Sequence, residues 1–150
     1  MTDKLIFMEL AIQEAKTAYE YGEVPVGAII VYKNEILASG RNRIIELADP
    51  TAHAEIIAIR KAAKLIGNYR LINTSIFVTL EPCSMCYGAI CHSRIKNIFF
   101  GAFDSNTGSC GSCLNLPKTQ CFNHRPKIVG GVMEKDCSNL LLDFFKEKRR

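Results

Sequence analysis

The 150-residue sequence predicts a three-layer α/β/α fold with a mixed central sheet of about five strands. Two observations lead to this prediction. Apolar residues recur at helical spacing near both ends of the chain, and short runs rich in β-branched residues lie between helix-forming segments. No internal repeat or linker is visible, so we expect residues 1–150 to form one domain, a length that suffices to bury a core.

The order of the elements follows from the apolar spacing and from the residues that end each run. We expect helices over residues 3–21, 52–65, 83–92 and 134–148, and strands over residues 26–32, 36–39, 75–80, 96–101 and 128–132. Residues 26–32 read VGAIIVY, which is typical of a buried strand. Pro82 favours the start of a helix at the residue that follows it. Residues 104–126 are rich in Gly, Asn and Ser and predict one long loop, a kind of segment that is usually functional.

Composition and charge exclude several classes of protein. The chain has 48% hydrophobic residues and a formal net charge of +4, which permits a polyanionic partner but does not demand one. No basic start precedes a long apolar run, so we expect neither a secretory signal nor a membrane span, and a cytoplasmic location. Seven cysteines in such a protein should stay reduced, which favours metal ligation over disulfides.

Two short motifs carry the predicted chemistry. Cys83 and Cys86 lie three residues apart at the start of a predicted helix, where the free N–H groups and the helix dipole favour thiolates. Together with His53 they make a three-ligand zinc site, whose open fourth position is typical of a catalytic centre. Water bound there has its pKa lowered to about 7, which provides hydroxide at neutral pH.

Glu55 is the predicted proton carrier of this site. Residues i and i+2 of a regular helix point to opposite sides, so His53 and Glu55 share a site only if His53 lies at the helix edge. Asp49-Pro50-Thr51 just before it allow that placement. Glu55 would then take a proton from the zinc-bound water and return it to the substrate ring and to the leaving ammonia.

The remaining cysteines leave alternatives open. A CxxC pair alone also occurs in structural zinc half-sites and in redox pairs. Cys110, Cys113, Cys121 and His124 have the spacing of a second zinc site. Cys91 and Cys137 lie on apolar helical faces and are most simply explained as small core residues.

Longer strings resemble a known family. The His-Ala-Glu motif followed by Pro-Cys-x-x-Cys is similar to the cytidine and deoxycytidylate deaminase superfamily. The strings that carry a closer resemblance, to the bacterial tRNA-specific adenosine deaminases, are EVPVGA (23–28), DPTAHAE (49–55), NYRL (68–71), TLEPC (79–83), HSRI (92–95), GAFD (101–104) and DFFK (143–146). Asn123-His124-Arg125 also resembles a family segment, one that occurs without the neighbouring cysteines, and the family's usual residues at 110 and 113 are not cysteine.

This resemblance implies a deaminase fold, a reaction and partners. It implies a homodimer with one zinc ion per subunit that binds a tRNA anticodon stem-loop, the arginine tRNA being the expected substrate. The wobble adenosine, flipped out of its stack, would become inosine when zinc-bound hydroxide attacks C6 and Glu55 shuttles the proton.

Several substrate-binding residues are carried over by the match. Asn42 resembles the family's base-binding asparagine, with a loop-capping role as the alternative, and Ala54 lies inside the His-Ala-Glu motif. Asp104 matches a loop acid near the flipped nucleotide, although such a residue is as often a turn former. The basic and aromatic residues of the C-terminal helix suit phosphates and splayed bases, or else form a core pair and a solvated tail: Phe144, Phe145, Arg149 and Arg150.

Two other functions compete with this interpretation. A zinc-dependent deaminase of a free base or nucleoside, such as guanine or cytosine, would use the same chemistry without needing the basic C-terminal helix. A zinc-stabilised RNA-binding module would need no Glu55 beside the metal. Truncation of the helix and substitution of Glu55 therefore separate the three hypotheses.

Overall fold

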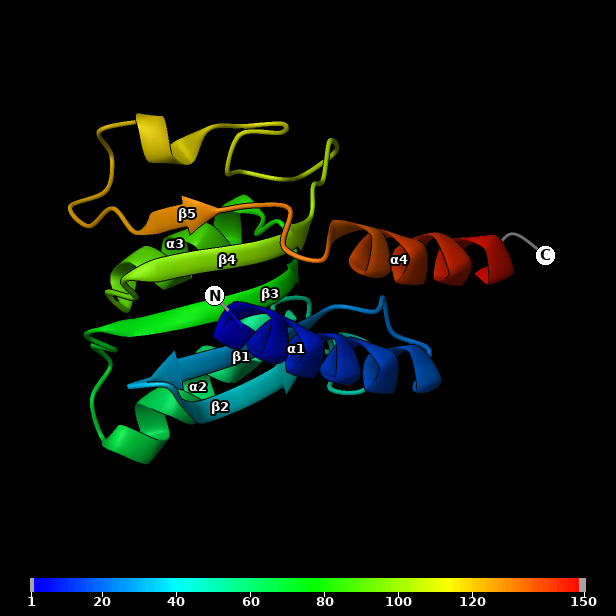
Figure 1. Ribbon diagram of the computed structural model, residues 1–150, viewed down its shortest axis with the longest axis horizontal. Helices are drawn as coiled ribbons and strands as arrows, with labels where there is room; N and C mark the ends of the chain where they lie inside the picture. The colour runs from blue at the N-terminus through cyan, green and yellow to red at the C-terminus, as the bar shows by residue number, and fades with distance from the viewer. Residues whose placement is uncertain (1, 149–150) are drawn as a thin grey trace.

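A five-stranded mixed sheet runs through the middle of the computed structural model, which describes residues 2–148 (Figure 1). The strands are β1 (Gly27–Tyr32), β2 (Glu35–Arg41), β3 (Thr74–Leu80), β4 (Asn97–Ala102) and β5 (Lys127–Val129). Their order across the sheet is β2-β1-β3-β4-β5, with β1 antiparallel to both of its neighbours and with β3, β4 and β5 parallel. This confirms the predicted mixed sheet of five strands.

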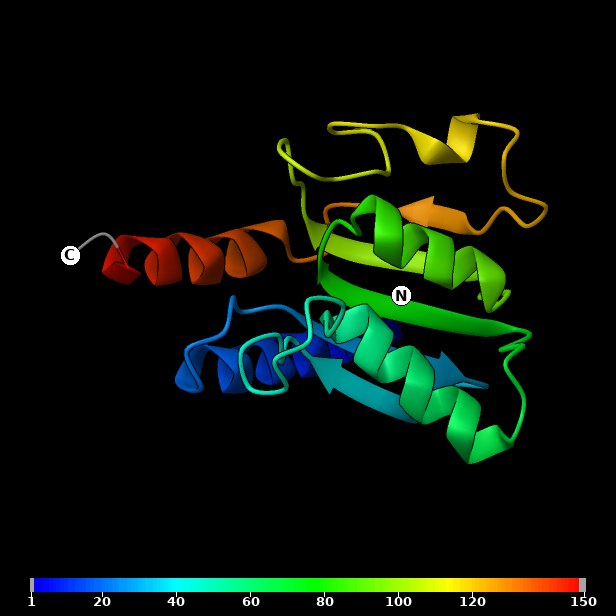
Figure 2. The same ribbon diagram turned by 180° about the vertical axis from the view of Figure 1, so that it is seen from behind.

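Helices cover both faces of the sheet and complete three layers. The helices α1 (Thr2–Glu20) and α4 (Glu134–Lys148) lie on one face, and α2 (Ala54–Ile66) and α3 (Ser84–His92) lie on the other (Figures 1 and 2). A single 3-10 turn, η1 (Leu116–Lys118), interrupts the long loop before β5. The predicted α/β/α layering is therefore confirmed.

Two apolar cores, one on each side of the sheet, hold the layers together. Successive residues of a strand point to opposite faces, so Ile30 packs towards α2 and α3 while Ile29 and Val31 pack towards α1. Because helices cover both faces of the sheet, β1 does not alternate between apolar and polar residues. It appears in the sequence as a continuous apolar run. Cys91 and Cys137 are both buried in these cores, as predicted.

Glycine brings two helices close to the sheet. A Cβ on Gly40 would lie 2.5 Å from the Ala54 carbonyl oxygen, so the first turn of α2 rests directly on the backbone of β2. A Cβ on Gly27 would overlap the Ala11 carbonyl oxygen of α1. A side chain at either position would push its helix away, and at Gly40 it would displace the end of α2 that carries the functional residues.

Most element boundaries differ slightly from the predicted ones, and two of the differences have clear local reasons. Helix α2 begins at Ala54 rather than at residue 52, because His53 is extended, with φ −71° and ψ 155°. Strand β5 ends at Val129, since Gly131 follows at a φ of 84°. Among residues 2–148, none of the helices combines the length and the apolarity needed to cross a membrane.

Candidate active site

The candidate site lies at the edge of the sheet where β3 and β4 end together. These strands are parallel, and Leu80 pairs with Ala102 at their last residues. The segments that follow, residues 81–83 and 103–107, therefore leave the sheet side by side. Side chains at the carboxyl ends of parallel strands are well placed to form a binding site.

His53 enters the site from the N-terminus of α2. The Asp49 carboxylate accepts hydrogen bonds from the Thr51 backbone N–H (2.9 Å) and hydroxyl (2.7 Å), which fixes the turn just before the helix. His53 is the N-cap residue and lies outside the regular helix. The predicted placement at the helix edge is thereby confirmed, and His53 and Glu55 line the same pocket.

Cys83 and Cys86 come from the first turn of α3. Cys83 is the extended N-cap residue, and its Sγ lies 3.7 Å from His53 Nδ1, while Cys86 Sγ lies 3.5 Å from the same atom. All three donor atoms lie within 4.8 Å of one another. A tetrahedral zinc with Zn–S of about 2.3 Å and Zn–N of about 2.0 Å separates its sulfur and nitrogen ligands by roughly 3.5 Å, so this donor set fits zinc.

The protonation of the two thiols differs. A hydrogen bond from the Cys86 thiol, with a further one from His53, lowers the pKa of Cys83 to about 4. The pKa of Cys86 is raised, because its thiol donates to Cys83 and is buried. Cys83 is therefore a thiolate at neutral pH, which is the form that ligates a metal.

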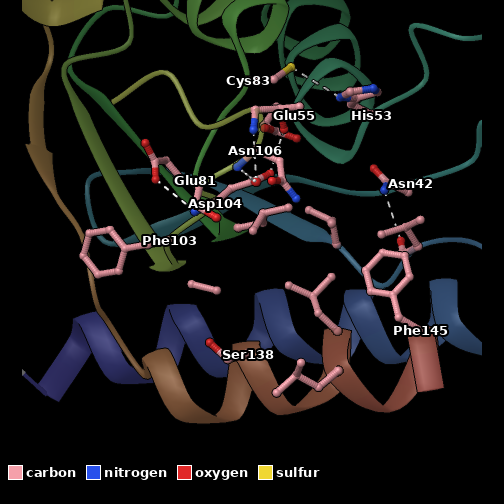
Figure 3. Close-up of a pocket in the computed structure, with 18 of the residues that line it drawn as sticks. Asn42, His53, Glu55, Glu81, Cys83, Phe103, Asp104, Asn106, Ser138 and Phe145 are labelled. Atoms are coloured by element: carbon pink, nitrogen blue, oxygen red, sulfur yellow. Dashed lines mark hydrogen bonds between the residues drawn. The ribbon is translucent and has the colours of Figure 1, made fainter. Parts of the chain in front are cut away.

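Glu55 is buried beside this donor set. It belongs to the first turn of α2, is 4% exposed, and lines the same cavity as His53 and Cys83 (Figure 3). Burial raises the pKa of its carboxyl group to about 7. A carboxyl group with a pKa near neutrality both accepts and returns protons readily, as a general acid and base must.

A cavity of about 720 Å³ opens in front of these residues. This volume lies within the range of pockets that take small organic ligands. Its walls come from the loop after β2, from residues 103–107, and from the face of α4 that carries Ser138, Leu141, Leu142 and Phe145 (Figure 3). Phe103 and Phe145 approach the cavity from opposite sides.

Asn42 lies in the cavity wall and joins two segments of the site. Its Nδ2 donates to the Val24 carbonyl oxygen (3.0 Å), and its Oδ1 accepts from the Ala54 backbone N–H (2.8 Å). The amide thus caps the N-terminus of α2 and orients the turn that carries His53 and Glu55. Ala54 itself is fully buried, and its backbone N–H is occupied by this bond.

Asp104 lies in the opposite wall and shapes its own loop. Its carboxylate accepts hydrogen bonds from the backbone N–H groups of Asn106 (3.0 Å) and Thr107 (3.1 Å) and from the Thr107 hydroxyl (2.7 Å). The side chain therefore acts as a turn former and also lines the cavity.

The two phenylalanines of α4 have different surroundings. Phe144 is buried, meets the Tyr19 ring of α1 at a centroid distance of 5.4 Å, and is absent from the cavity lining. Phe145 is 44% exposed and lines the cavity. Arg149 and Arg150, also predicted to bind substrate, lie outside the described residues.

The second cysteine group is dispersed. Cys113 and Cys121 are exposed, and His124 Nε2 is 2.6 Å from the Ile95 carbonyl oxygen. Within residues 2–148, His53, Cys83 and Cys86 form the one group of three side chains that fits a metal.

Glu81 and Phe103 are among the cavity-lining residues to which the sequence assigned no role. Glu81, whose carboxylate is bonded to the loop after β4, lies in the cavity wall two residues before Cys83, and Phe103 presents its ring at the cavity edge. A charged residue directly between a buried strand and a metal ligand was the available signal for Glu81. No comparable signal in the sequence distinguishes Phe103.

Comparisons with known proteins agree with this geometry. Residues 1–102 match the family model of the cytidine and deoxycytidylate deaminase zinc-binding region. The chain is 43% identical over 150 residues to a tRNA-specific adenosine deaminase of Bacillus subtilis, and the match spans 100% of this chain and 93% of that protein. It is 48% identical over 143 residues to the protein of that name from Haemophilus influenzae, covering 95% of this chain and 83% of that protein.

Solved structures show the same relationship. One from studies of A-to-I editing by tRNA:A34 deaminases at the wobble position superposes with a TM-score of 0.88 at 41% identity, over 90% of this chain and 98% of that one. A guanine deaminase from Nitrosomonas europaea, at 18% identity and a TM-score of 0.78 over 93% of this chain and 83% of that one, shares the fold. The chain therefore belongs to the cytidine and deoxycytidylate deaminase family, where its relatives include tRNA-specific adenosine deaminases.

Proposed function

We propose that this chain hydrolyses adenosine to inosine at the wobble position of a tRNA, with an arginine tRNA as substrate. The observation that carries the proposal is the convergence of His53, Cys83 and Cys86 beside the buried Glu55 at one end of a cavity of about 720 Å³. Relatives at 43% and 48% identity named tRNA-specific adenosine deaminases support the choice of substrate.

The proposed chemistry needs one zinc ion and one proton carrier. His53, Cys83 and Cys86 would hold the zinc ion, which would supply a Lewis acid toward the water that attacks C6 of adenine. Glu55 takes a proton from the attacking water and gives one to the ring nitrogen N1. It then takes the remaining proton from the oxygen now bonded to C6 and gives it to the leaving amine, so that adenosine and water become inosine and ammonia.

The walls of the cavity suit an adenine that has left its stack. Asn42 uses one N–H and one lone pair within the protein, so the second N–H and the second lone pair of its amide remain for a purine edge. Phe145 and Phe103 are 44% and 52% exposed, and aromatic rings of this kind stack on neighbouring bases of a single strand. We propose that Asp104 lies near the flipped nucleotide and stabilises the protein loop of residues 103–107 that would contact it.

The wider RNA contacts follow from the resemblance and from charge. Arg149 and Arg150 are proposed to bind phosphates of the anticodon stem-loop, with Phe144 supporting helix α4, which precedes them in the sequence. A small α/β domain offers little continuous surface to a folded stem-loop, so we propose that residues 1–150 form one catalytic domain of a homodimer. A tRNA substrate and reduced cysteines suit a cytoplasmic enzyme.

The decisive experiment incubates the purified, zinc-loaded protein with an unmodified arginine tRNA and maps inosine along it. We expect inosine at the wobble position only, and none with the Glu55→Ala variant, which should retain its zinc. The same protein is incubated with free guanine, cytosine and adenosine. Turnover of a free base without any inosine in the tRNA would overturn the proposed substrate and favour a free-base deaminase.

A further inference from the structure

Glu81 is a buried carboxylate that the proposed chemistry does not use. It follows β3 directly, is 2% exposed, and stands between the strand and Pro82-Cys83. In the part of the chain that the structure describes, no lysine or arginine forms an ion pair with it. A buried charge without a cation is costly unless other polar groups solvate it, so the groups around Glu81 must supply that solvation.

The groups that donate hydrogen bonds to Glu81 all belong to the loop after β4. Oε1 accepts from the Asp104 backbone N–H (3.1 Å) and from the Ser112 hydroxyl. Oε2 accepts from the backbone N–H groups of Cys110 (2.9 Å) and Ser112 (3.2 Å). The Glu81 carboxylate thus accepts hydrogen bonds from three backbone N–H groups and one hydroxyl, all from residues 23 to 31 positions later in the chain.

The loop closes tightly around this carboxylate. A Cβ on Gly108 would lie 2.5 Å from the Glu81 Cδ atom and would overlap the Asp104 carbonyl oxygen. The neighbouring Ser109 donates to the Pro82 carbonyl oxygen through both its backbone N–H (2.9 Å) and its hydroxyl (2.8 Å). The loop is therefore fastened to residues 81 and 82, which lead straight into the metal ligand Cys83.

The same loop forms one wall of the cavity. Residues 103–107 line it together with His53, Glu55 and Cys83 (Figure 3). The bonds to Glu81, together with those from Ser109 to Pro82, connect this wall to the segment that leads into the metal ligand Cys83. An error of about 1 Å in the placement of a substrate is enough to lower a catalytic rate on the order of a hundredfold.

We propose that Glu81 is a positioning residue, which holds the wall formed by residues 103–107 in register with Cys83 and so sets where the substrate base lies. The proposal rests on the proposed function only for its kinetic readout. Its structural readout, the protection of the loop amides, needs no substrate.

The test compares Glu81→Gln with Glu35→Gln, a matched change at an exposed residue that begins β2. A glutamine has one acceptor oxygen. If that oxygen keeps the bonds to Cys110 and Ser112, its NH₂ group faces the Asp104 N–H, and this bond is lost. We expect hydrogen exchange of peptides covering residues 103–112 to accelerate about tenfold, with the exchange of α2 and α3 unchanged.

The kinetic arm measures kcat on tRNA, zinc content and tRNA affinity in the same variants. For Glu81→Gln we expect kcat to fall roughly 10- to 100-fold with one zinc per chain retained. The Kd, measured in a Glu55→Gln background to prevent turnover, should stay within about threefold, because phosphate contacts dominate RNA affinity. Ser112→Ala, which removes only the hydroxyl bond, should change exchange and kcat in the same direction by less.

Several results would overturn the proposal. Unchanged loop exchange and parental kcat in Glu81→Gln would show that the wall does not depend on this carboxylate. Loss of zinc, or faster exchange throughout the chain, would show that Glu81 supports the metal site or the fold as a whole. If the parent protein leaves tRNA unmodified while loop exchange responds as expected, the proposed substrate fails and the positioning role stands.

Discussion

Two pairs of cysteines with the same C-x-x-C spacing behave differently in this molecule. After Cys83 a helix begins at once, so Cys86 lies in its first turn and both thiols approach His53. After Cys110 the chain turns at Gly111, whose φ is 133°, and Cys113 ends exposed. The same C-x-x-C spacing thus brings two thiols to one point only where a helix begins directly after the first cysteine.

The two regions also differ in the charge state of the sulfur. Hydrogen bonds from Cys86 and His53 lower the pKa of Cys83 to about 4. Burial raises the pKa of Cys110 to about 12, with the nearby Glu81 charge adding to the effect. One thiol is prepared to ligate a cation and the other stays protonated, so local environment separates a metal ligand from an inert thiol.

The largest expected effect comes from exchanging one residue of each pair for serine. Cys83→Ser removes a zinc ligand, and we expect loss of bound zinc and of all detectable inosine formation. Cys113→Ser, the matched change in the exposed pair, should leave both at the parental level. Zinc content by atomic emission and inosine mapping of the tRNA measure the two effects, and zinc loss in Cys113→Ser would revive the second metal site.

A smaller effect is expected from Glu55→Gln. The amide cannot carry the proton, so the rate should fall by about 10²–10⁴ while one zinc per chain remains. Single-turnover rates on tRNA, measured beside zinc content and the circular dichroism spectrum, check this. Parental activity, or loss of metal together with activity, would show that Glu55 does not serve as the proton carrier.

The sequence was sufficient for most of the fold, because helices and buried strands leave local apolar patterns. It also indicated His53, Cys83 and Cys86 as donors for one metal, and the structure brings these three side chains together with Glu55 beside them. The predicted helix began at Cys83, whereas the structure makes Cys83 the residue that precedes the helix. The role of Glu81 was beyond such reasoning. Its bonds reach residues 23 to 31 positions away, and no local periodicity encodes them.

The lining of the cavity by α4 was equally hard to anticipate in detail. Phe144 and Phe145 have the same side chain in adjacent positions, yet one contacts Tyr19 of α1 and the other lines the cavity. The rotation of α4 about its axis decides which of the two rings packs against α1 and which faces the cavity. That rotation depends on long-range packing, which no local pattern in the sequence shows.

The two thiol environments predict different alkylation after zinc is removed with a chelator. A pH of 6 is above the pKa of Cys83, which is about 4, and far below the pKa of Cys110, which is about 12. Of these two thiols, only Cys83 is therefore a thiolate at that pH. We expect iodoacetamide to label Cys83 at least about tenfold faster than Cys110, and zinc to protect Cys83. Mass spectrometry of the peptides measures both, and equal labelling would contradict the assigned environments.

The smallest effect is expected at the C-terminus, away from either cysteine pair in the sequence. Changing Arg149 and Arg150 to alanine should lower tRNA affinity and reduce the slope of log affinity against log salt by about 0.7 for each phosphate that the variant no longer binds. Zinc content should not change. Titrations at several salt concentrations decide the matter, and a parental affinity and slope would mark these residues as a solvated end.

The contrast between the cysteine pairs is tested most directly by the amount of zinc bound to the purified parent protein. One zinc per chain is expected, held by His53, Cys83 and Cys86. A value near two would contradict this contrast by giving the dispersed Cys110 group a metal of its own, and a value of zero in protein prepared with zinc would remove the basis of the proposed chemistry.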